Sequence, residues 1–195
     1  MIASAGRGGG WIVTASGRRF HPLDPRPDDV LLEDVARALS NLCRFTGHTR
    51  EFYSVAEHSC RVALEAYRSS GDPREGLAGL YHDAAEAYVN DLSTPLKHSH
   101  ALTGYRIVEA GVQAAVARAA GVSPEKSWHV ARADRVLLLT EARDLLPGGL
   151  DALWVDANGL FPLSEPILPY SPAAARAWFL ELDGSFKQLM RAGNA

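Results

Sequence analysis

The sequence predicts an all-α fold, a bundle of about five to seven helices with a small β-hairpin at the N-terminus. Apolar residues recur at helical spacing in several segments, and residues that favour helix N-caps precede most of these segments. The connections are short apart from residues 147–170, which contain four prolines and three glycines. We expect one domain over residues 1–195, with residues 1–10 loose.

The composition is ordinary for a globular protein, with 47% hydrophobic and 22% charged residues. The net charge is −3 and the 20 basic residues are scattered, so we expect no nucleic-acid partner. The sequence has no apolar run of the length that a secretory signal or a membrane span needs. Cys43 and Cys60 stand apart without a C-x-x-C motif, which favours a reducing compartment. We therefore expect a cytoplasmic protein with no membrane association.

The first elements follow from local sequence. Residues 11–14 and 18–22 flank the turn Ala-Ser-Gly and predict the hairpin, which needs a larger body to pack on. From about Leu32 the apolar spacing becomes helical, and this helix ends near Cys43.

Capping residues mark the next helices. Ser54 and Glu57 form an S-x-x-E capping box, which predicts a helix over residues 55–68. Asp72 as N-cap and Pro73 at the first helical position begin a helix that continues through residues 82–86. Pro95 favours a break after this helix, so we expect residues 91–97 to fold back over it.

The second half of the chain predicts further helices over residues 103–120, over residues 124–145 after the cap Ser123, and over residues 172–190 after the cap Ser171. The last helix is amphipathic, and its large apolar side chains are expected to face inward: Trp178, Phe179, Leu182, Phe186 and Leu189.

The stretch from Tyr81 to Lys97 carries the strongest chemical signal. His82 and Asp83 are adjacent and Glu86 follows one helical turn later, so at about 100° per residue all three share one helix face. A neutral imidazole beside a carboxylate suits a divalent cation. Without further ligands, the same residues fit an ordinary polar helix surface.

Two residues on other helices could complete such a site. His58 lies in the first full turn of its helix, where a single histidine is more often structural. Asp134 stands among mostly apolar neighbours, and a buried carboxylate needs an arginine, a hydrogen-bond network or a metal ion.

The order His58, His82-Asp83, Asp134 on separate helices resembles the HD-domain superfamily of metal-dependent phosphohydrolases. The block from His82 to Lys97, H-D-x-x-E-x(4)-D-x-x-T-P-L-K, is similar to that of the HD-domain 5'-deoxynucleotidases and their relatives. Residues 44–59 resemble a group of small bacterial and phage HD hydrolases. The resemblance implies an HD-type helical bundle.

This resemblance implies that His58, His82, Asp83 and Asp134 are metal ligands. Two imidazoles and two carboxylates suit Co, Mn, Zn, Fe or Ni, and the sequence does not choose among these ions. Glu86 would then orient or deprotonate the attacking water, or relay a proton to the leaving oxygen.

The resemblance also implies substrate contacts. Asp91 matches a second acidic residue of the family, which contacts the sugar or the scissile group. Arg44 matches a phosphate-binding arginine, although it also fits a helix C-terminal arginine that faces the helix dipole. Phe45 stands where tryptophan is common. Lys97 and His48 are further candidates for phosphate contact, although an exposed lysine such as Lys97 is more often simply solvated.

We therefore expect an enzyme that removes the 5'-phosphate from deoxynucleoside monophosphates. A related hypothesis is a triphosphohydrolase that releases triphosphate from deoxynucleoside triphosphates. A third hypothesis is a non-catalytic nucleotide-sensing module, against which Glu86 and Asp91 argue, and a fourth is a hydrolase of alarmone nucleotides. The resemblance also favours a homodimer, since family members of this size are often dimers, and the last helix could either form the interface or complete the core.

Overall fold

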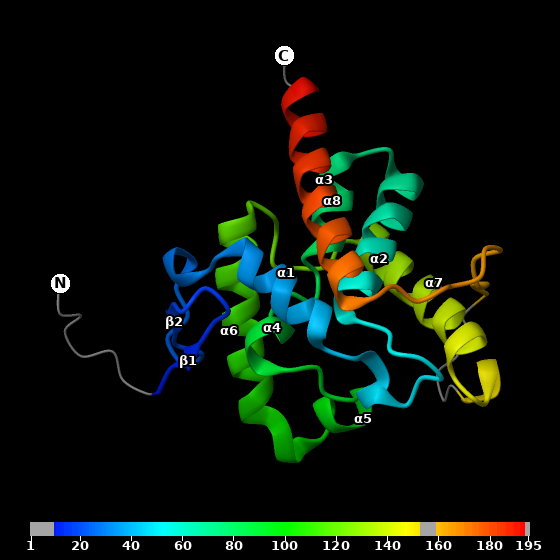
Figure 1. The fold of residues 1–195 in the computed structure, drawn as a ribbon, viewed down its shortest axis with the longest axis horizontal. Helices are drawn as coiled ribbons and strands as arrows, with labels where there is room; N and C mark the ends of the chain where they lie inside the picture. Colours follow the sequence, from blue (N-terminus) through cyan, green and yellow to red (C-terminus); the bar gives the residue numbers. More distant parts are fainter. Residues whose placement is uncertain (1–9, 153–158, 194–195) are drawn as a thin grey trace.

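The computed structural model describes residues 10–152 and 159–193 and shows a mostly helical chain (Figure 1). A small antiparallel sheet, β1 (Ile12–Val13) and β2 (Arg19–Phe20), pairs Ile12 with Phe20. The described residues form eight α-helices: α1 (Leu32–Asn41), α2 (Val55–Ser70), α3 (Pro73–Leu80), α4 (Glu86–Val89), α5 (Thr94–Lys97), α6 (Thr103–Ala120), α7 (Trp128–Leu145) and α8 (Pro172–Ala192). The prediction of an all-α fold with an N-terminal hairpin is confirmed.

Helix α2 lies at the centre of the bundle and contacts α1, α3, α7 and α8. Its apolar residues enter two core clusters on different sides. Ala56 and Cys60 join Leu39, Leu80 and Phe179, whereas Val62 and Ala66 pack with Tyr53, Val130 and Leu137. Cys60 is thus a buried core residue. Because α2 runs between the clusters, its first turn is held from several directions.

Helices α2 and α3 approach each other closely at Gly79. A Cβ atom on Gly79 would lie 3.0 Å from the Cα atom of Ala63, which is too short for an ordinary carbon contact. Glycine at this position therefore permits the spacing of the two helices that flank the predicted metal site.

Local capping chemistry determines several helix ends. The side chains of Ser54, Asp72 and Ser171 accept hydrogen bonds from backbone N–H groups at the starts of α2, α3 and α8. Gly121 ends α6 with a φ of 76°, in the left-handed region that favours glycine. These predicted helix ends are confirmed.

Other predictions of helix extent are wrong. The helix that begins at Pro73 does not continue through residues 82–86, because it ends at Leu80 and α4 begins at Glu86. Likewise α7 begins at Trp128 rather than after Ser123, because the Ser127 side chain caps it by accepting from the Val130 N–H. The separation of α3 from α4, together with the short α5, raises the number of α-helices above the predicted five to seven.

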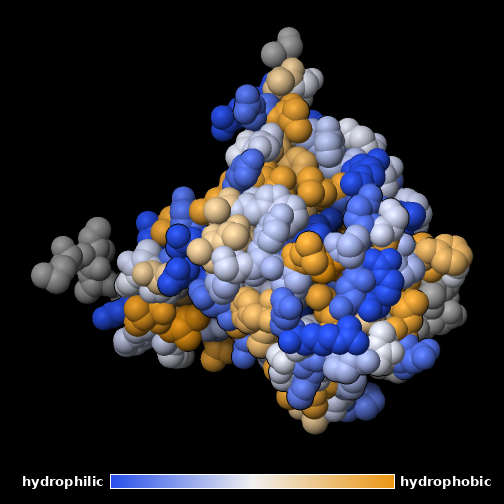
Figure 2. All heavy atoms as spheres, turned by 45° about the vertical axis from the view of Figure 1, so that its right-hand side comes forward, coloured by the Kyte–Doolittle hydropathy of each residue, from blue (hydrophilic) through white to orange (hydrophobic). Residues whose placement is uncertain are grey.

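Helix α8 packs on α1, α2 and α3, and its far end projects from the body (Figure 1). Phe179 and Phe186 are buried, so this helix completes the core, one of the two roles expected for it. Leu189 is instead 44% exposed, which corrects the prediction that it faces inward. Figure 2 shows apolar side chains reaching the surface at this projecting end.

Candidate metal centre

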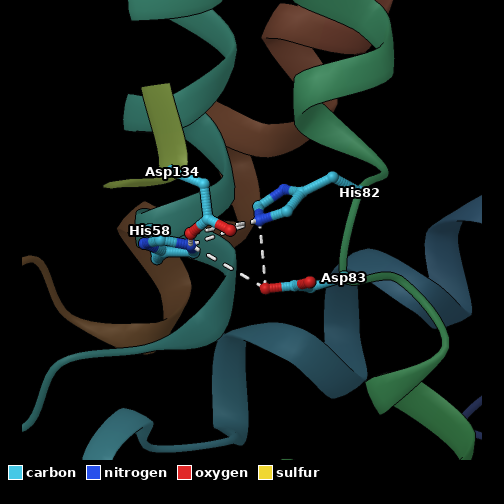
Figure 3. Close-up of side chains that lie close together, drawn as sticks. All are labelled: His58, His82, Asp83 and Asp134. Carbon is cyan, nitrogen blue, oxygen red and sulfur yellow. Dashed lines mark hydrogen bonds and ion pairs between the residues drawn. The ribbon is translucent and has the colours of Figure 1, made fainter. Parts of the chain in front are cut away.

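The first histidine of the predicted site is buried in the first turns of α2. His58 is fully buried, and its Nδ1 lies 2.6 Å from Oε1 of Glu141 on α7. A carboxylate accepts here, so Nδ1 carries the proton and Nε2 keeps its lone pair. Nε2 points toward the other predicted ligands (Figure 3).

The second histidine lies in the turn between α3 and α4. The Nδ1–H of His82 donates to the carbonyl oxygen of Gly79 at 2.7 Å. Its Nε2 is thereby directed to the same point as that of His58, and the two Nε2 atoms lie 3.3 Å apart. Backbone and carboxylate acceptors thus orient the two imidazoles in matching ways.

The two predicted carboxylates complete the group. Oδ2 of Asp83 lies 3.0 Å from Nε2 of His82, and Oδ1 of Asp134 lies 3.3 Å from Nε2 of His58. The ligand atoms of these four residues all lie within 4.8 Å of one another (Figure 3). The structure therefore brings together the whole predicted metal-binding set.

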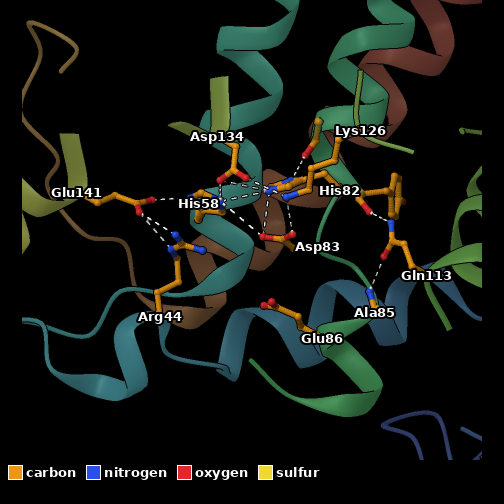
Figure 4. Close-up of polar contacts among 12 residues, drawn as sticks. Arg44, His58, His82, Asp83, Ala85, Glu86, Gln113, Lys126, Asp134 and Glu141 are labelled. Carbon is orange, nitrogen blue, oxygen red and sulfur yellow. Dashed lines mark hydrogen bonds and ion pairs between the residues drawn. The ribbon is translucent and has the colours of Figure 1, made fainter. Parts of the chain in front are cut away.

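Lys126 contacts both carboxylates through the oxygens that face away from the imidazoles. Its Nζ lies 3.1 Å from Oδ1 of Asp83 and 2.9 Å from Oδ2 of Asp134. Each carboxylate thus directs one oxygen to the imidazoles and the other to the lysine (Figure 4). Sequence reasoning missed Lys126, although its place just before the helix that carries Asp134 was a usable signal.

The charges of this group suit a cation. Burial raises the pKa of Asp83, but His82 and Lys126 outweigh it and hold that pKa well below its usual range. Burial also opposes ionisation of Asp134, but its contacts with His58 and His82 and the positive charge of Lys126 hold the pKa of Asp134 well below its usual range. Two charged carboxylates and two oriented Nε2 atoms form a donor set that fits a divalent metal ion.

Glu141 forms a second layer behind His58. This fully buried carboxylate accepts from the Tyr53 hydroxyl at 3.0 Å and from Nε and Nη2 of Arg44 at 3.2 and 3.0 Å. The sequence alone shows only that Glu141 lies on a predicted helix, because its partners lie far away in the chain.

The binding of Arg44 to Glu141 changes the expected role of the arginine. Nε and Nη2, the pair suited to a bidentate grip, are engaged with Glu141. Figure 4 shows the remaining guanidinium nitrogen directed toward the side of Asp83 and Glu86. Arg44 can therefore still offer a positive charge to a ligand there, through one nitrogen.

Glu86 is the most unusual acid in the site. It is only 4% exposed, its Oε1 accepts from Nζ of Lys97 at 2.8 Å, and Oε2 has no hydrogen-bond partner within the described residues. Burial, with the negative charges of Asp83 and Asp91, raises the pKa of Glu86 to about 8. A carboxyl group that exchanges its proton near neutral pH suits acid–base chemistry.

Two cavities adjoin this group. One, of about 250 Å³, is lined by Arg44, Phe45, Asp91, Leu92, Thr94 and Leu138, among others. The other, of about 310 Å³, lies toward α6 and is lined by Arg106, Glu109 and Gln113, among others. Asp83, Glu86, Lys97 and Lys126 line both cavities. The predicted fold-back of residues 91–97 is confirmed, because Lys97 reaches Glu86.

The backbone beside the first cavity is strained. Within the described residues, the non-glycine residues with positive φ are Phe45 at 52°, Thr46 at 54° and Asn90 at 75°. They adjoin Arg44 and Asp91, which both line that cavity. Such conformations cost about 1–3 kcal/mol each and concentrate at functional sites.

The structure does not bring every predicted residue to the site. His48 is exposed and lies outside the residues that line the two cavities. The Asp134 side chain is 28% exposed, so burial alone does not demand a partner for it, contrary to the sequence argument. Its imidazole and lysine contacts mark it as part of the cluster.

Sequence comparison with known proteins shows the family of this chain. No family model matches the chain. The uncharacterized protein YfdR of Escherichia coli (strain K12) is 36% identical over 186 residues, which cover 93% of the chain and 98% of YfdR. The chain belongs to the YfdR family. The uncharacterized protein RCAP_rcc00048 of Rhodobacter capsulatus is 41% identical over 93 residues, 45% of this YfdR-family chain and 46% of that protein.

None of the helices that the structure describes in this YfdR-family chain has the length and apolar character needed to cross a bilayer.

Proposed function

We propose that this protein is a metal-dependent phosphohydrolase of the HD-domain type, acting in the cytoplasm on nucleotides. The observation that carries the proposal is the convergence of His58, His82, Asp83 and Asp134 beside a buried glutamate, one oxygen of which has no hydrogen-bond partner among the described residues. A site that only bound a cation would not need such an acid. The HD-like order of these residues in the sequence agrees with the proposal.

The division of labour follows from the contacts. A divalent ion in this donor set would neutralise phosphate oxygens and make water more acidic. Glu86 takes the proton of the attacking water on Oε2 as the new P–O bond forms and passes it to the leaving 5'-oxygen as the old P–O bond breaks, while Lys97 fixes its other oxygen. Arg44 offers positive charge to the phosphate from the far side of the first cavity.

The first cavity suits a nucleoside. Phe45, Leu92 and Leu138 supply apolar surface for a base, and Asp91 and Thr94 supply acceptors for sugar hydroxyl groups. We therefore propose (deoxy)nucleoside 5'-monophosphates as the substrates, with phosphate and nucleoside as products.

The second cavity favours triphosphate hydrolysis as a second candidate function. It opens on the other side of Asp83 and Glu86 and brings Arg106, Lys97 and Lys126 near the reacting position. Cations beyond the site of attack could hold the triphosphate group of a nucleoside triphosphate. This triphosphate group would then be released intact.

Product analysis tests these proposals. Metal-reconstituted protein is incubated with each common nucleoside mono- and triphosphate, and products are separated by chromatography and assayed for phosphate. We expect inorganic phosphate from monophosphates, whereas intact triphosphate would establish the triphosphohydrolase. Asp134→Ala should lose both bound metal and turnover, while Asp28→Ala, at an exposed aspartate, should keep both. Wild-type protein that binds metal and nucleotide yet turns over neither class would instead be a sensor.

A further inference from the structure

The two neighbouring ligands pose a geometric problem. On the continuous helix that the sequence predicts, His82 and Asp83 would share a broad face but point about 100° apart, without converging on one point. Yet Nε2 of His82 and Oδ2 of Asp83 lie 3.0 Å apart and share one focus. This convergence requires a backbone that departs from a regular helix between them.

The structure shows such a departure. Helix α3 ends at Leu80 and α4 begins at Glu86. Between them the backbone hydrogen bonds span three residues, from the Ala84 N–H to the Tyr81 carbonyl at 3.2 Å and from the Glu86 N–H to the Asp83 carbonyl at 3.1 Å. Bonds of this kind tighten the turn and re-aim the side chains within it.

Gln113 of α6 occupies the place of a helical hydrogen bond in this turn. Its Nε2 donates to the Tyr81 carbonyl oxygen at 2.8 Å, and its Oε1 accepts from the Ala85 N–H at 2.9 Å. In a continuous helix, the Ala85 N–H would donate to that same Tyr81 carbonyl. The amide of Gln113 therefore stands between the two halves of one backbone bond (Figure 4).

We infer that Gln113 is a positioning residue for the metal centre, which holds α3 and α4 apart so that His82 and Asp83 point at one ion. The inference rests on the metal centre proposed above. Glutamine suits this task because one planar group supplies both a donor and an acceptor. Satisfying both backbone groups makes the interruption stable, since unpaired buried backbone groups are costly.

Substitution by leucine separates this role from a general structural one. Leucine has a similar size and no polar atom, so in Gln113→Leu the Tyr81 carbonyl and the Ala85 N–H can bond each other and close the helix. A merely structural glutamine would lower folding stability and metal affinity together. A positioning glutamine gives a metal-free protein that stays stable and binds metal weakly.

The experiment uses full-length, metal-free protein titrated with Co²⁺ against a competing chelator, with the visible absorption of bound Co²⁺ as a second readout. Thermal unfolding and far-ultraviolet circular dichroism are recorded without metal. Gln188→Leu, at the chain's other glutamine, is the matched control because Gln188 is exposed on α8. Gln113→Ala is a second variant in which the backbone bond can also close.

We expect Gln113→Leu to weaken Co²⁺ binding about 10- to 100-fold and to alter the Co²⁺ spectrum. Its metal-free melting temperature and helical signal should match or exceed those of wild type, and Gln188→Leu should leave every readout unchanged. Wild-type affinity in both Gln113 variants would overturn the inference. So would a loss of affinity that runs parallel to a loss of metal-free stability in both. If the wild-type protein itself bound no Co²⁺, the proposed metal centre would be rejected, and this inference would be rejected with it.

Discussion

The two sides of the metal centre differ in how completely their polar groups are partnered. On the His58 side, Glu141 is fully buried and bonds to His58, Tyr53 and Arg44. On the Glu86 side, an equally enclosed carboxyl has one lysine partner and one oxygen with none in the described part of the chain. Satisfied buried networks hold geometry, whereas an unsatisfied buried group costs stability. Under the proposed function, the first side would hold the ligands and the second would react.

The sharpest test of this contrast is Glu86→Gln. The amide keeps the size and the contact to Lys97 but cannot take a proton, so we expect turnover to fall about 10²- to 10⁴-fold. Metal content and melting temperature should stay at wild-type levels, as should all properties of Glu181→Gln at an exposed position of α8. Turnover near the wild-type rate would remove Glu86 from the chemistry.

Glu141→Leu should show the opposite pattern. It leaves the Arg44 charge without its buried partner, so we expect a loss of about 3–5 kcal/mol in the free energy of unfolding, measured by denaturant titration. Metal affinity should also fall because His58 loses the acceptor that fixes its ring. An unfolding free energy like that of the surface variant Glu181→Leu would contradict the proposed holding role.

Lys126→Met probes the charge balance between the two sides. Without the ammonium group, the carboxylates of Asp83 and Asp134 repel each other in metal-free protein, which should lower its melting temperature. A bound cation supplies the missing charge, so the rise in melting temperature on adding metal should exceed that of wild type. Equal rises in both proteins would show that the lysine does not balance the ligand charges.

The smallest expected effect is a shift in the pH dependence of kcat/KM. Burial and the acids Asp83 and Asp91 raise the pKa of Glu86, while the positive charge of Lys97 lowers it. Removing that charge in Lys97→Met should raise this pKa further. If ionised Glu86 acts as the base, the rise of kcat/KM with pH should then occur at higher pH than in wild type. An unmoved or lowered pH midpoint would show that another group limits the rate at low pH.

Much of the fold could be predicted because local chemistry determines it. The caps at Ser54 and Asp72 and the left-handed Gly121 involve residues a few positions apart. The clustering of His58, His82, Asp83 and Asp134 was also predictable, since their order along the chain resembles a known family. The break between Leu80 and Glu86 was not predictable in this way, because its partner, Gln113, lies on another helix. The role of Glu141 was missed for the same reason, whereas Lys126 was missed although its partner Asp134 lies only eight residues later in the chain.

The close approach of α2 and α3 at Gly79 has a consequence for ion choice. The Gly79 carbonyl orients His82, and the missing side chain lets α3 lie against the α2 backbone near Ala63, five residues after His58. Glycine has only a hydrogen atom where other residues carry a Cβ atom, and this small size sets the distance between the two imidazoles. Gly79→Ala would act as a spacer that lengthens this gap without touching a ligand. If the proposed metal centre binds an ion, the packing distance between α2 and α3 would therefore influence which ion sizes it accepts.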